Sequence, residues 1–177
     1  GQRVLSGMGE LHLEIMIERL IREFKVKANV GKPQVAYRET ITRPAEAEGV
    51  FANAIGDKNL YAGVKLRLSP VEENQGLQIE VDKNKFGYDD KIIAMLKEGL
   101  KAAMQTGILA GYPLDDVRCE LAGLDIHESV PNEQAFQIAA RIAMQNGLEQ
   151  AGSVLLEPLM NISVVTPEEY MGDVIAD

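Results

Sequence analysis

The sequence predicts an α+β fold, because strand-like and helix-like patterns occupy separate segments of the same chain. Between residues 50 and 81, and again at 117–121, apolar residues alternate with polar ones, which is the period of a half-buried strand. Residues 89–106 and 133–150 instead repeat apolar residues at helical spacing. Apolar residues make up 46% of the 177 residues, which is enough to form a buried core.

One helix and one strand are predicted near the N-terminal end of the sequence. Residues 9–24 repeat apolar side chains at helical spacing, with charged residues between them. At residues 26–30 the period changes to two, which predicts a half-buried strand. Residues 34–41 are predicted to be extended, and residues 43–48 are the best candidate for a linker because they begin with Arg-Pro.

A three-stranded meander is predicted for the next part of the chain. Turn-forming residues separate its strands: Gly56-Asp57-Lys58-Asn59 follows the first strand, and Asn74-Gln75-Gly76 precedes the third. Ser69-Pro70 ends the second strand, since proline cannot donate to a sheet ladder. The predicted strands are residues 50–55, 64–68 and 77–81.

The two helices at 89–106 and 133–150 each have a capping residue. Asp89 or Asp90 can cap the first, because a short carboxylate accepts hydrogen bonds from the exposed amides of a first turn. Gly107 is predicted to end this helix in a left-handed conformation. Asn132 can cap the second helix. Between them, the strand at 117–121 carries the single cysteine, Cys119, as a core residue.

The last part of the sequence predicts a strand and the start of a helix. Leu159–Val165 has the composition of a strand, and Thr166-Pro167-Glu168-Glu169 combines a cap, an N-terminal proline and an acidic third position. A short helix after one strand cannot bury its apolar face alone. The sequence therefore predicts one complete α+β domain at residues 44–156, with a part of another domain at 1–43 and at 157–177.

Composition and charge exclude several classes of protein. One cysteine excludes an internal disulfide framework, and one cysteine with two histidines excludes a zinc finger. The sequence has neither a signal peptide at its start nor an apolar run of membrane-spanning length, so a soluble protein of a reducing compartment is expected. The net charge of −9 argues against nonspecific coating of nucleic acid. Residues 114–177 alone carry −10, so the acid is concentrated in the last third.

The residues that could carry out chemistry do not form a catalytic set. The sequence has no phosphate-binding P-loop and no Gly-x-Ser-x-Gly nucleophile motif. His12 is predicted on the charged side of the first helix, and His127 lies in a polar loop, without a second histidine at metal-ligand spacing. No catalytic residue and no metal site are therefore expected within this chain.

Several long strings, in order along the chain, resemble translation elongation factor G. The first ones match the third domain of that family and its passage into the fourth. Leu109-Ala110-Gly111-Tyr112-Pro113 is similar to a signature of the fourth domain, and the last strings resemble the beginning of the fifth. The matching strings are residues 7–15, 24–26, 28–41, 109–113, 155–160 and 164–175.

The resemblance implies a fold for each part of the chain. Residues 44–156 would be domain IV, a small α+β domain of the ribosomal protein S5 domain 2 type with a left-handed β-α-β crossover. Such connections are right-handed in most proteins. Residues 1–43 would be the C-terminal part of domain III and residues 157–177 the start of domain V, both ferredoxin-like and both partial.

The resemblance also implies a function. Elongation factor G is a GTPase that drives tRNA–mRNA translocation, and its domain IV mimics the anticodon arm of tRNA and enters the decoding site of the small ribosomal subunit. The implied partners are the ribosome, with its mRNA and tRNA, and ribosome recycling factor, but no membrane; the implied location is cytoplasmic. GTP and Mg²⁺ belong to the G domain of the family, which this sequence does not contain, so no cofactor is expected in this chain.

Two loops at the tip of domain IV meet RNA in this family, and both are altered here. The first loop, at residues 56–63, keeps Tyr61 but has Lys58 in place of an arginine, which preserves the charge and loses the planar fork. In the second loop, at residues 123–133, His127 matches the tip histidine of the family. The residues that the resemblance implies as ribosome contacts are Asp57, Lys58, Asn59, Tyr61, His127, Glu128 and Ser129.

The altered tip leaves three hypotheses open. The chain could come from a divergent paralogue of elongation factor G that still binds the ribosome, with a role in translocation or recycling. It could come from a ribosomal-protection protein of the tetracycline-resistance kind, whose domain IV also has divergent tips. In the third hypothesis it is a scaffold or interaction module that no longer contacts RNA. The first tip loop and its strand carry Lys58, Lys65 and Arg67, whereas the acid is concentrated after residue 113. An acidic body with a small polar tip suits a factor that enters an RNA site briefly and leaves it.

Overall fold

The computed structural model describes residues 3–55, 58–127, 131–161, 163, 165–167 and 171–172, and for residues 54, 55, 58 and 59 it describes the backbone alone. The chain forms two compact units. One consists of Tyr37–Glu157, and the other consists of residues 1–36 and 158–177. The predicted α+β class is confirmed, because the larger unit packs helices against antiparallel strands.

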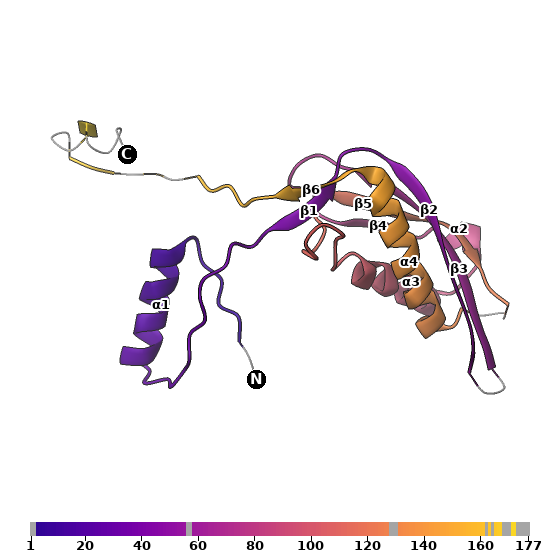
Figure 1. The fold of residues 1–177 in the computed structure, drawn as a ribbon, viewed down its shortest axis with the longest axis horizontal. Coiled ribbons are helices and arrows are strands. Elements are labelled where there is room, and N and C mark those ends of the chain that lie inside the picture. Colours follow the sequence, from indigo (N-terminus) through magenta and orange to yellow (C-terminus); the bar gives the residue numbers. More distant parts are fainter. Residues whose placement is uncertain are drawn as a thin grey trace. The chain divides into compact units, whose positions relative to one another are not determined.

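The larger unit is built on a four-stranded sheet (Figure 1). Its strands, in spatial order, are β2 (Ala45–Ile55), β3 (Lys58–Pro70), β5 (Val117–Asp125) and β4 (Gln78–Glu80). β3 pairs antiparallel with both of its neighbours, whereas β4 pairs parallel with β5. The predicted meander is therefore wrong in its last strand, because β4 lies on β5 and not on β3.

The start of β2 corrects a second prediction. Residues 45–48 are strand and not linker, and they pair with Lys65 to Leu68 of β3. Ala47 faces the core, while Glu46 and Glu48 face outward and bind basic side chains of β3. The charged residues of this segment thus lie on the solvent-facing side of a strand.

A second, two-stranded sheet lies where the chain enters and leaves the larger unit. β1 (Arg38–Ile41) pairs antiparallel with β6 (Ser153–Leu156), so that Thr40 lies opposite Val154. The strand predicted at Leu159–Val165 is wrong for its described residues, which lie outside any strand. The strand forms earlier, at β6, because β1 offers it a hydrogen-bonding partner there.

The helices begin where the sequence predicts. In α3 (Asp90–Ala103) the Asp89 carboxylate accepts from the backbone N–H of Ile92 at 2.9 Å. In α4 (Glu133–Ala151) the Asn132 side chain accepts from the N–H of Ala135 at 3.0 Å. Gly152 ends α4 in the left-handed region, with φ 69°. A short helix that was not predicted, α2 (Lys83–Phe86), precedes α3.

The prediction for Gly107 is wrong. This glycine has no left-handed backbone, and the residue that caps the C-terminus of α3, Met104, has a right-handed conformation. Glycine is required at 107 for another reason: a Cβ there would overlap the carboxylate of Glu39. The residue that excludes a side chain at position 107 is thus far away in the sequence.

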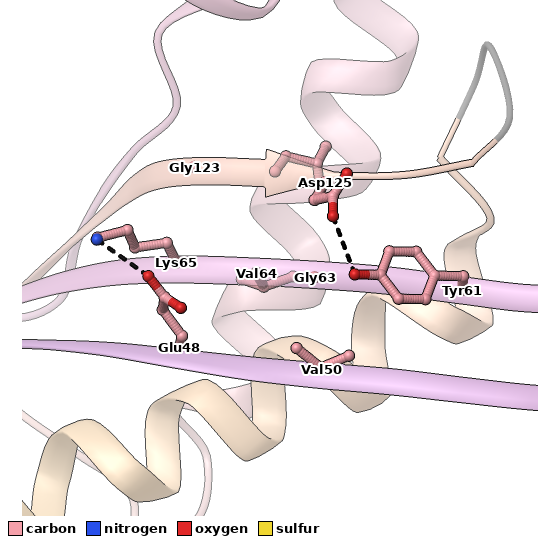
Figure 2. Close-up of a pocket in the computed structure, with 9 residues that line it drawn as sticks. Glu48, Val50, Tyr61, Gly63, Val64, Lys65, Gly123 and Asp125 are labelled. Atoms are coloured by element: carbon pink, nitrogen blue, oxygen red, sulfur yellow. Dashed lines mark hydrogen bonds and ion pairs between the residues drawn. The ribbon is translucent and has the colours of Figure 1, made fainter.

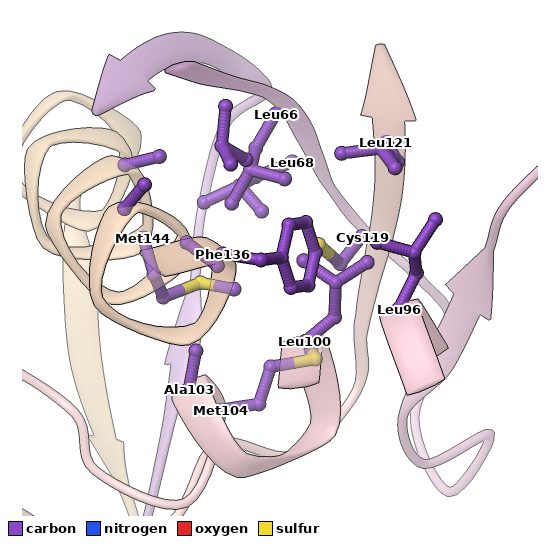
Figure 3. Packing of buried hydrophobic residues seen from close by; sticks show 14 of the residues in the cluster. Leu66, Leu68, Leu96, Leu100, Ala103, Met104, Cys119, Leu121, Phe136 and Met144 are labelled. Carbon is purple, nitrogen blue, oxygen red and sulfur yellow. The ribbon is translucent and has the colours of Figure 1, made fainter. Parts of the chain in front are cut away.

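The core lies between the sheet and helices α3 and α4 (Figure 3). Phe136 of α4 is fully buried and packs directly on the backbone of Gly99 in α3. Most other buried residues of α4 are small, which lets the helix axis approach β2 and β3 closely. The small buried residues of α4 are Ala135, Ala139, Ala140, Ala143, Gly147 and Ala151.

Cys119 is confirmed as a core residue and leads to a first testable prediction. Its side chain is fully buried on β5, and burial raises the pKa of the thiol to about 12, with a smaller contribution from the charge of Glu120. The reactive thiolate is therefore scarce at neutral pH. We expect a thiol reagent to label the native chain very slowly at pH 7.5 and to label it fully in denaturant. Rapid labelling of native protein, measured by mass spectrometry, would contradict this placement.

The smaller unit contains α1 (Glu10–Arg22). Two ion pairs of i,i+4 spacing, Arg22–Glu18 and Arg19–Glu23, lie along its exposed surface. The strand predicted at residues 26–30 is wrong: Val26 and Val30 are exposed, and the segment has no ladder partner among the described residues. None of the helices in the described ranges combines the length and apolar character needed to cross a bilayer.

Candidate functional site at the tip of the sheet

The hairpin of β2 and β3 extends beyond the rest of the sheet (Figure 1). β3 pairs with β2 from Lys58 onward, but it pairs with β5 only from Gly63. Ile55 lies opposite Lys58, so the hairpin connection is two residues long and shorter than the predicted four-residue turn. Residues 58–62 therefore form the free end of the hairpin, which we call the tip.

Two of the predicted contact residues meet at this tip. The rings of Tyr61 and His127 are stacked, with centroids 3.9 Å apart and planes inclined by 4°. Tyr61 lies on the outer face of β3 because its neighbour Ala62 is buried under the helices. His127 is exposed and follows the end of β5. The stack thus joins the two loops that the resemblance places together.

Asp125, the last residue of β5, holds the stack in place. Its carboxylate accepts a hydrogen bond from the Tyr61 hydroxyl at 2.9 Å (Figure 2). This bond, together with partial desolvation and the charge of Asp125, raises the pKa of the Tyr61 hydroxyl. The Tyr61 hydroxyl therefore loses its proton less readily than a free tyrosine and donates it in a hydrogen bond to Asp125. The hydrogen bond to Asp125 thus fixes the position of the Tyr61 ring, on which His127 stacks.

A β-bulge explains how Asp125 reaches the outer face. Cys119 and Leu121 face the core, so simple alternation would also turn Asp125 inward. The register shifts at Ala122, which is left unpaired on β5, and the carbonyl of Ala122 accepts from the Lys85 ammonium at 2.6 Å. One extra residue reverses the alternation, and Asp125 then lies opposite Gly63 on the outer face.

Beside Tyr61 and Asp125, the outer face of the sheet is hollowed where two glycines lack side chains (Figure 2). The hollow has a volume of about 290 Å³. A Cβ at Gly63 would lie 3.2 Å from the Cβ of Asp125, and a Cβ at Gly123 would lie 3.2 Å from that of Lys65. The residues around the hollow are Glu48, Val50, Tyr61, Gly63, Val64, Lys65, Gly123, Leu124 and Asp125.

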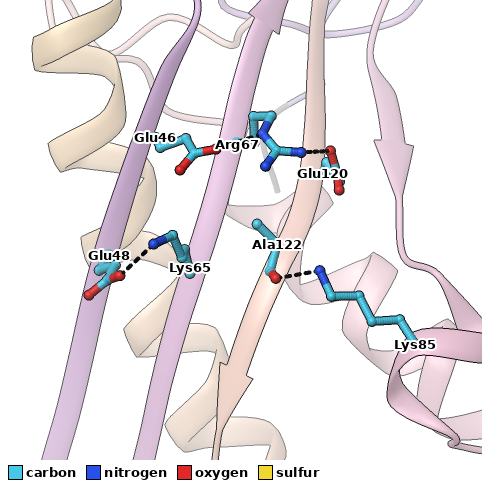
Figure 4. Close-up of polar contacts among 7 residues, drawn as sticks. All are labelled: Glu46, Glu48, Lys65, Arg67, Lys85, Glu120 and Ala122. Atoms are coloured by element: carbon cyan, nitrogen blue, oxygen red, sulfur yellow. Dashed lines mark hydrogen bonds and ion pairs between the residues drawn. The ribbon is translucent and has the colours of Figure 1, made fainter.

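Ion pairs engage two of the basic residues of β3 that the sequence associates with RNA binding (Figure 4). Lys65 binds Glu48 at 3.0 Å. Arg67 bridges Glu46 at 2.7 Å and Glu120 at 2.8 Å, and its hydrogen bond and charge lower the pKa of the Glu46 carboxyl. The outer face therefore carries a salt-bridge ladder and is less suited to phosphate binding than the sequence suggests.

The described residues contain no group of three or more histidine, cysteine or acidic side chains placed to share a metal ion. The tip offers a stacked aromatic surface, the carboxylate of Asp125 and the hydrogen-bonding groups of His127. Nucleic-acid bases stack on such aromatic rings, and histidine can donate to or accept from RNA. This arrangement suits recognition of a polar, planar partner.

Comparison with known proteins places the chain in a family. The family model "Elongation factor G, domain IV" matches residues 33–152, and the model "Elongation Factor G, domain III" matches residues 1–32. The chain belongs to the elongation factor G family. It is 48% identical, over all 177 residues, to "Elongation factor G 2" of Syntrophomonas wolfei and covers 26% of that protein.

A solved structure shares the fold of this elongation factor G chain. A crystal structure of a protein from Thermus thermophilus superimposes with a TM-score of 0.70 at 32% sequence identity. The match covers 96% of this chain and 25% of that protein. The chain thus spans about a quarter of the length of the relatives it matches, and the family models for domains III and IV together cover residues 1–152.

The structure describes the positions of part of the predicted contact set. It brings Tyr61 and His127 together, and it places the backbone of Lys58 and Asn59 in β3 at the tip. The other three predicted residues, Asp57, Glu128 and Ser129, lie outside the described residues. Sequence reasoning missed Asp125 as a partner of Tyr61, because the bulge that turns it outward leaves no mark in the local pattern of polarity.

Proposed function

We propose that this chain is the ribosome-binding part of an elongation factor G-like translational GTPase. Its domain IV enters the decoding site of the small subunit, in the manner of a tRNA anticodon arm, and promotes translocation of tRNA and mRNA. The family match and 48% identity over the whole chain support this proposal. The observation that carries it is the stack of Tyr61 and His127 at the free end of the hairpin.

The remaining parts of the proposal concern the intact protein. GTP and Mg²⁺ would bind its G domain, and this chain would supply neither a cofactor site nor a catalytic residue. Residues 157–177 would begin domain V, as the resemblance implies. The protein would act in the cytoplasm and could also serve in ribosome recycling with ribosome recycling factor.

The tip chemistry leads to a second testable prediction. Replacing Lys58 and His127 together by alanine in the full-length factor removes one charge and one half of the aromatic stack. We expect translocation, followed by stopped-flow fluorescence, to slow by about tenfold, because a lost base–aromatic contact costs roughly 1–3 kcal/mol. Ribosome-stimulated GTP hydrolysis should stay close to wild type, because the substitutions lie outside the G domain.

A matched control is Lys97→Ala with Glu98→Ala, a pair of exposed positions on α3 far along the chain from either tip loop. This control should translocate at the wild-type rate. Unchanged translocation in the tip variant would refute the assigned contacts. A factor that rescues translation from tetracycline without translocating would instead support the ribosomal-protection hypothesis, and failure to co-sediment with ribosomes in the presence of GTP would support the scaffold hypothesis.

A further inference from the structure

Glu39 is a fully buried acidic residue far in the sequence from the tip loops. Its side chain is 0% exposed, on strand β1. The carboxylate accepts three backbone hydrogen bonds from one loop: Leu109 N–H at 3.0 Å, Ala110 N–H at 2.9 Å and Tyr112 N–H at 3.1 Å. Within the described part of the chain, no basic side chain forms an ion pair with it. Among the described residues, backbone N–H groups therefore balance the buried charge.

The loop that surrounds this carboxylate has the shape of an anion-binding nest. Gly111 takes a left-handed backbone, with φ 79°, which lets successive N–H groups point to one side. Gly107 contributes a place without a side chain, and the Glu39 carboxylate occupies the space of the missing Cβ. The loop therefore encloses the carboxylate from the side of its N–H groups and from the side of Gly107.

The backbone of the loop and of β1 is joined independently of the carboxylate. Glu39 N–H donates to Pro113 carbonyl oxygen at 3.0 Å, and Asp115 N–H donates to Glu39 carbonyl oxygen at 2.8 Å. The rings of Tyr37 and Tyr112 also lie 5.4 Å apart. These contacts hold the loop against β1 when the carboxylate is removed, so the N–H groups should stay directed at the same point.

We propose that residues 107–112 form a backbone carboxylate-binding site, whose resident ligand is Glu39 and which binds a small carboxylate from solution when that side chain is absent. Replacement of Glu39 by alanine removes a CH₂–COO⁻ group, and acetate has the same size and charge. The backbone N–H groups that bind Glu39 would bind acetate in its place. The inference does not depend on the proposed role in translation.

The experiment measures thermal unfolding of the Glu39→Ala chain in acetate. In chloride buffer at pH 7 we expect the melting temperature to fall by roughly 10 °C relative to wild type, because several buried N–H groups lose their acceptor. Acetate at about ten times its dissociation constant should restore roughly 4 °C of that loss. Wild-type protein should show no comparable rise in acetate.

The controls separate site binding from a general salt effect. Sodium chloride at equal ionic strength and acetamide, which is neutral and of similar size, should not restore the melting temperature of Glu39→Ala. Glu39→Gln should also fail to respond to acetate, because its side chain still fills the site. Equal stabilisation of Glu39→Ala by acetate, chloride and acetamide, or no stabilisation by any of them, would overturn the proposal.

A second variant keeps the proposal testable if Glu39→Ala does not fold in chloride. Gly107→Ala places a methyl group where the carboxylate lies, so it should be destabilised in the presence of Glu39. In the double variant Glu39→Ala/Gly107→Ala that clash is gone, and the methyl group fills the acetate site. The double variant should then melt at a higher temperature than Gly107→Ala, and acetate should not raise its melting temperature. A double variant that melts no higher than Gly107→Ala would count against a shared site.

Discussion

Replacing Gly49 by alanine is expected to destabilise the larger unit by about 3 kcal/mol, at the upper end of the cost of overpacking. Gly49 lies on β2, where helix α4 crosses the sheet. An added Cβ would overlap the carbonyl oxygen of Ala139 and the amide nitrogen of Ala143, and it would lie 2.9 Å from the Cα of Ala143. All three atoms are backbone, so no side-chain rotation can relieve the overlap.

Two other glycines provide the comparison. Gly31→Ala makes the same chemical change where nothing lies within 4 Å, and it should leave the free energy of unfolding within about 0.5 kcal/mol of wild type. At Gly147 the nearest atom is Cδ1 of Leu68, at 2.8 Å, and a side chain can move. Gly147→Ala should therefore cost less than Gly49→Ala. Urea unfolding followed by circular dichroism measures all three; equal values for Gly49 and Gly31 would refute direct contact between α4 and β2.

Those features of the fold that depend on neighbouring residues could be predicted from the sequence. Asp89 and Asn132 cap helices because their short side chains reach N–H groups only three residues ahead. The partner of β4 could not be predicted in this way, because it is set by the crossover through α3 to β5. The role of Gly107 could not be predicted either. This position excludes a side chain because the carboxylate of Glu39 lies there, and Glu39 comes close only when the chain folds.

In the candidate site, too, the contacts between residues far apart in the sequence could not be predicted from local patterns. Tyr61 and His127 were identified through the resemblance to a family, and no local pattern in the sequence relates one to the other. Their contact requires the hairpin to extend past β5 and His127, two residues after the end of β5, to lie against the Tyr61 ring. The outward position of Asp125 requires the bulge at Ala122, which depends on the pairing with β3. Long-range pairing, not local propensity, therefore assembles the tip.

The strands predicted at residues 26–30 and 159–165 show the limit of periodicity. Their alternation and composition suit a strand, yet the described residues of both segments lie outside any ladder. A strand needs a neighbour that supplies hydrogen-bonding groups along its edge. β6 forms because β1 supplies them, beginning with the pair Ile41 and Ser153. Polarity patterns thus indicate which segments can form a strand, but they do not predict whether another strand lies beside them.

Replacing Glu39 by glutamine should lower the free energy of unfolding by about 3 kcal/mol at pH 7, because it removes a buried charge that accepts several hydrogen bonds. The amide has nearly the shape of the carboxylate, so packing is preserved. Its NH₂ group, however, would face backbone donors of the 107–112 loop where an oxygen now accepts. Glu98→Gln, at an exposed position on α3, should change stability by less than about 0.5 kcal/mol.

The pH dependence of the difference in unfolding free energy between wild type and Glu39→Gln tests directly whether the Glu39 carboxyl is ionised. Burial raises the pKa of the Glu39 carboxyl, but the N–H groups of residues 109–112 outweigh it and hold the pKa below its ordinary value of 4.5. A lowered pKa in the folded state means that the ionised carboxylate stabilises the fold fully above pH 4.5 and loses this contribution as the pH falls through the folded-state value. The gap between wild type and Glu39→Gln should thus be constant from pH 6 to 8 and narrow in acid. A gap that stays constant down to pH 3, in urea unfolding of both proteins, would show that Glu39 stabilises the loop through its shape and not through its charge.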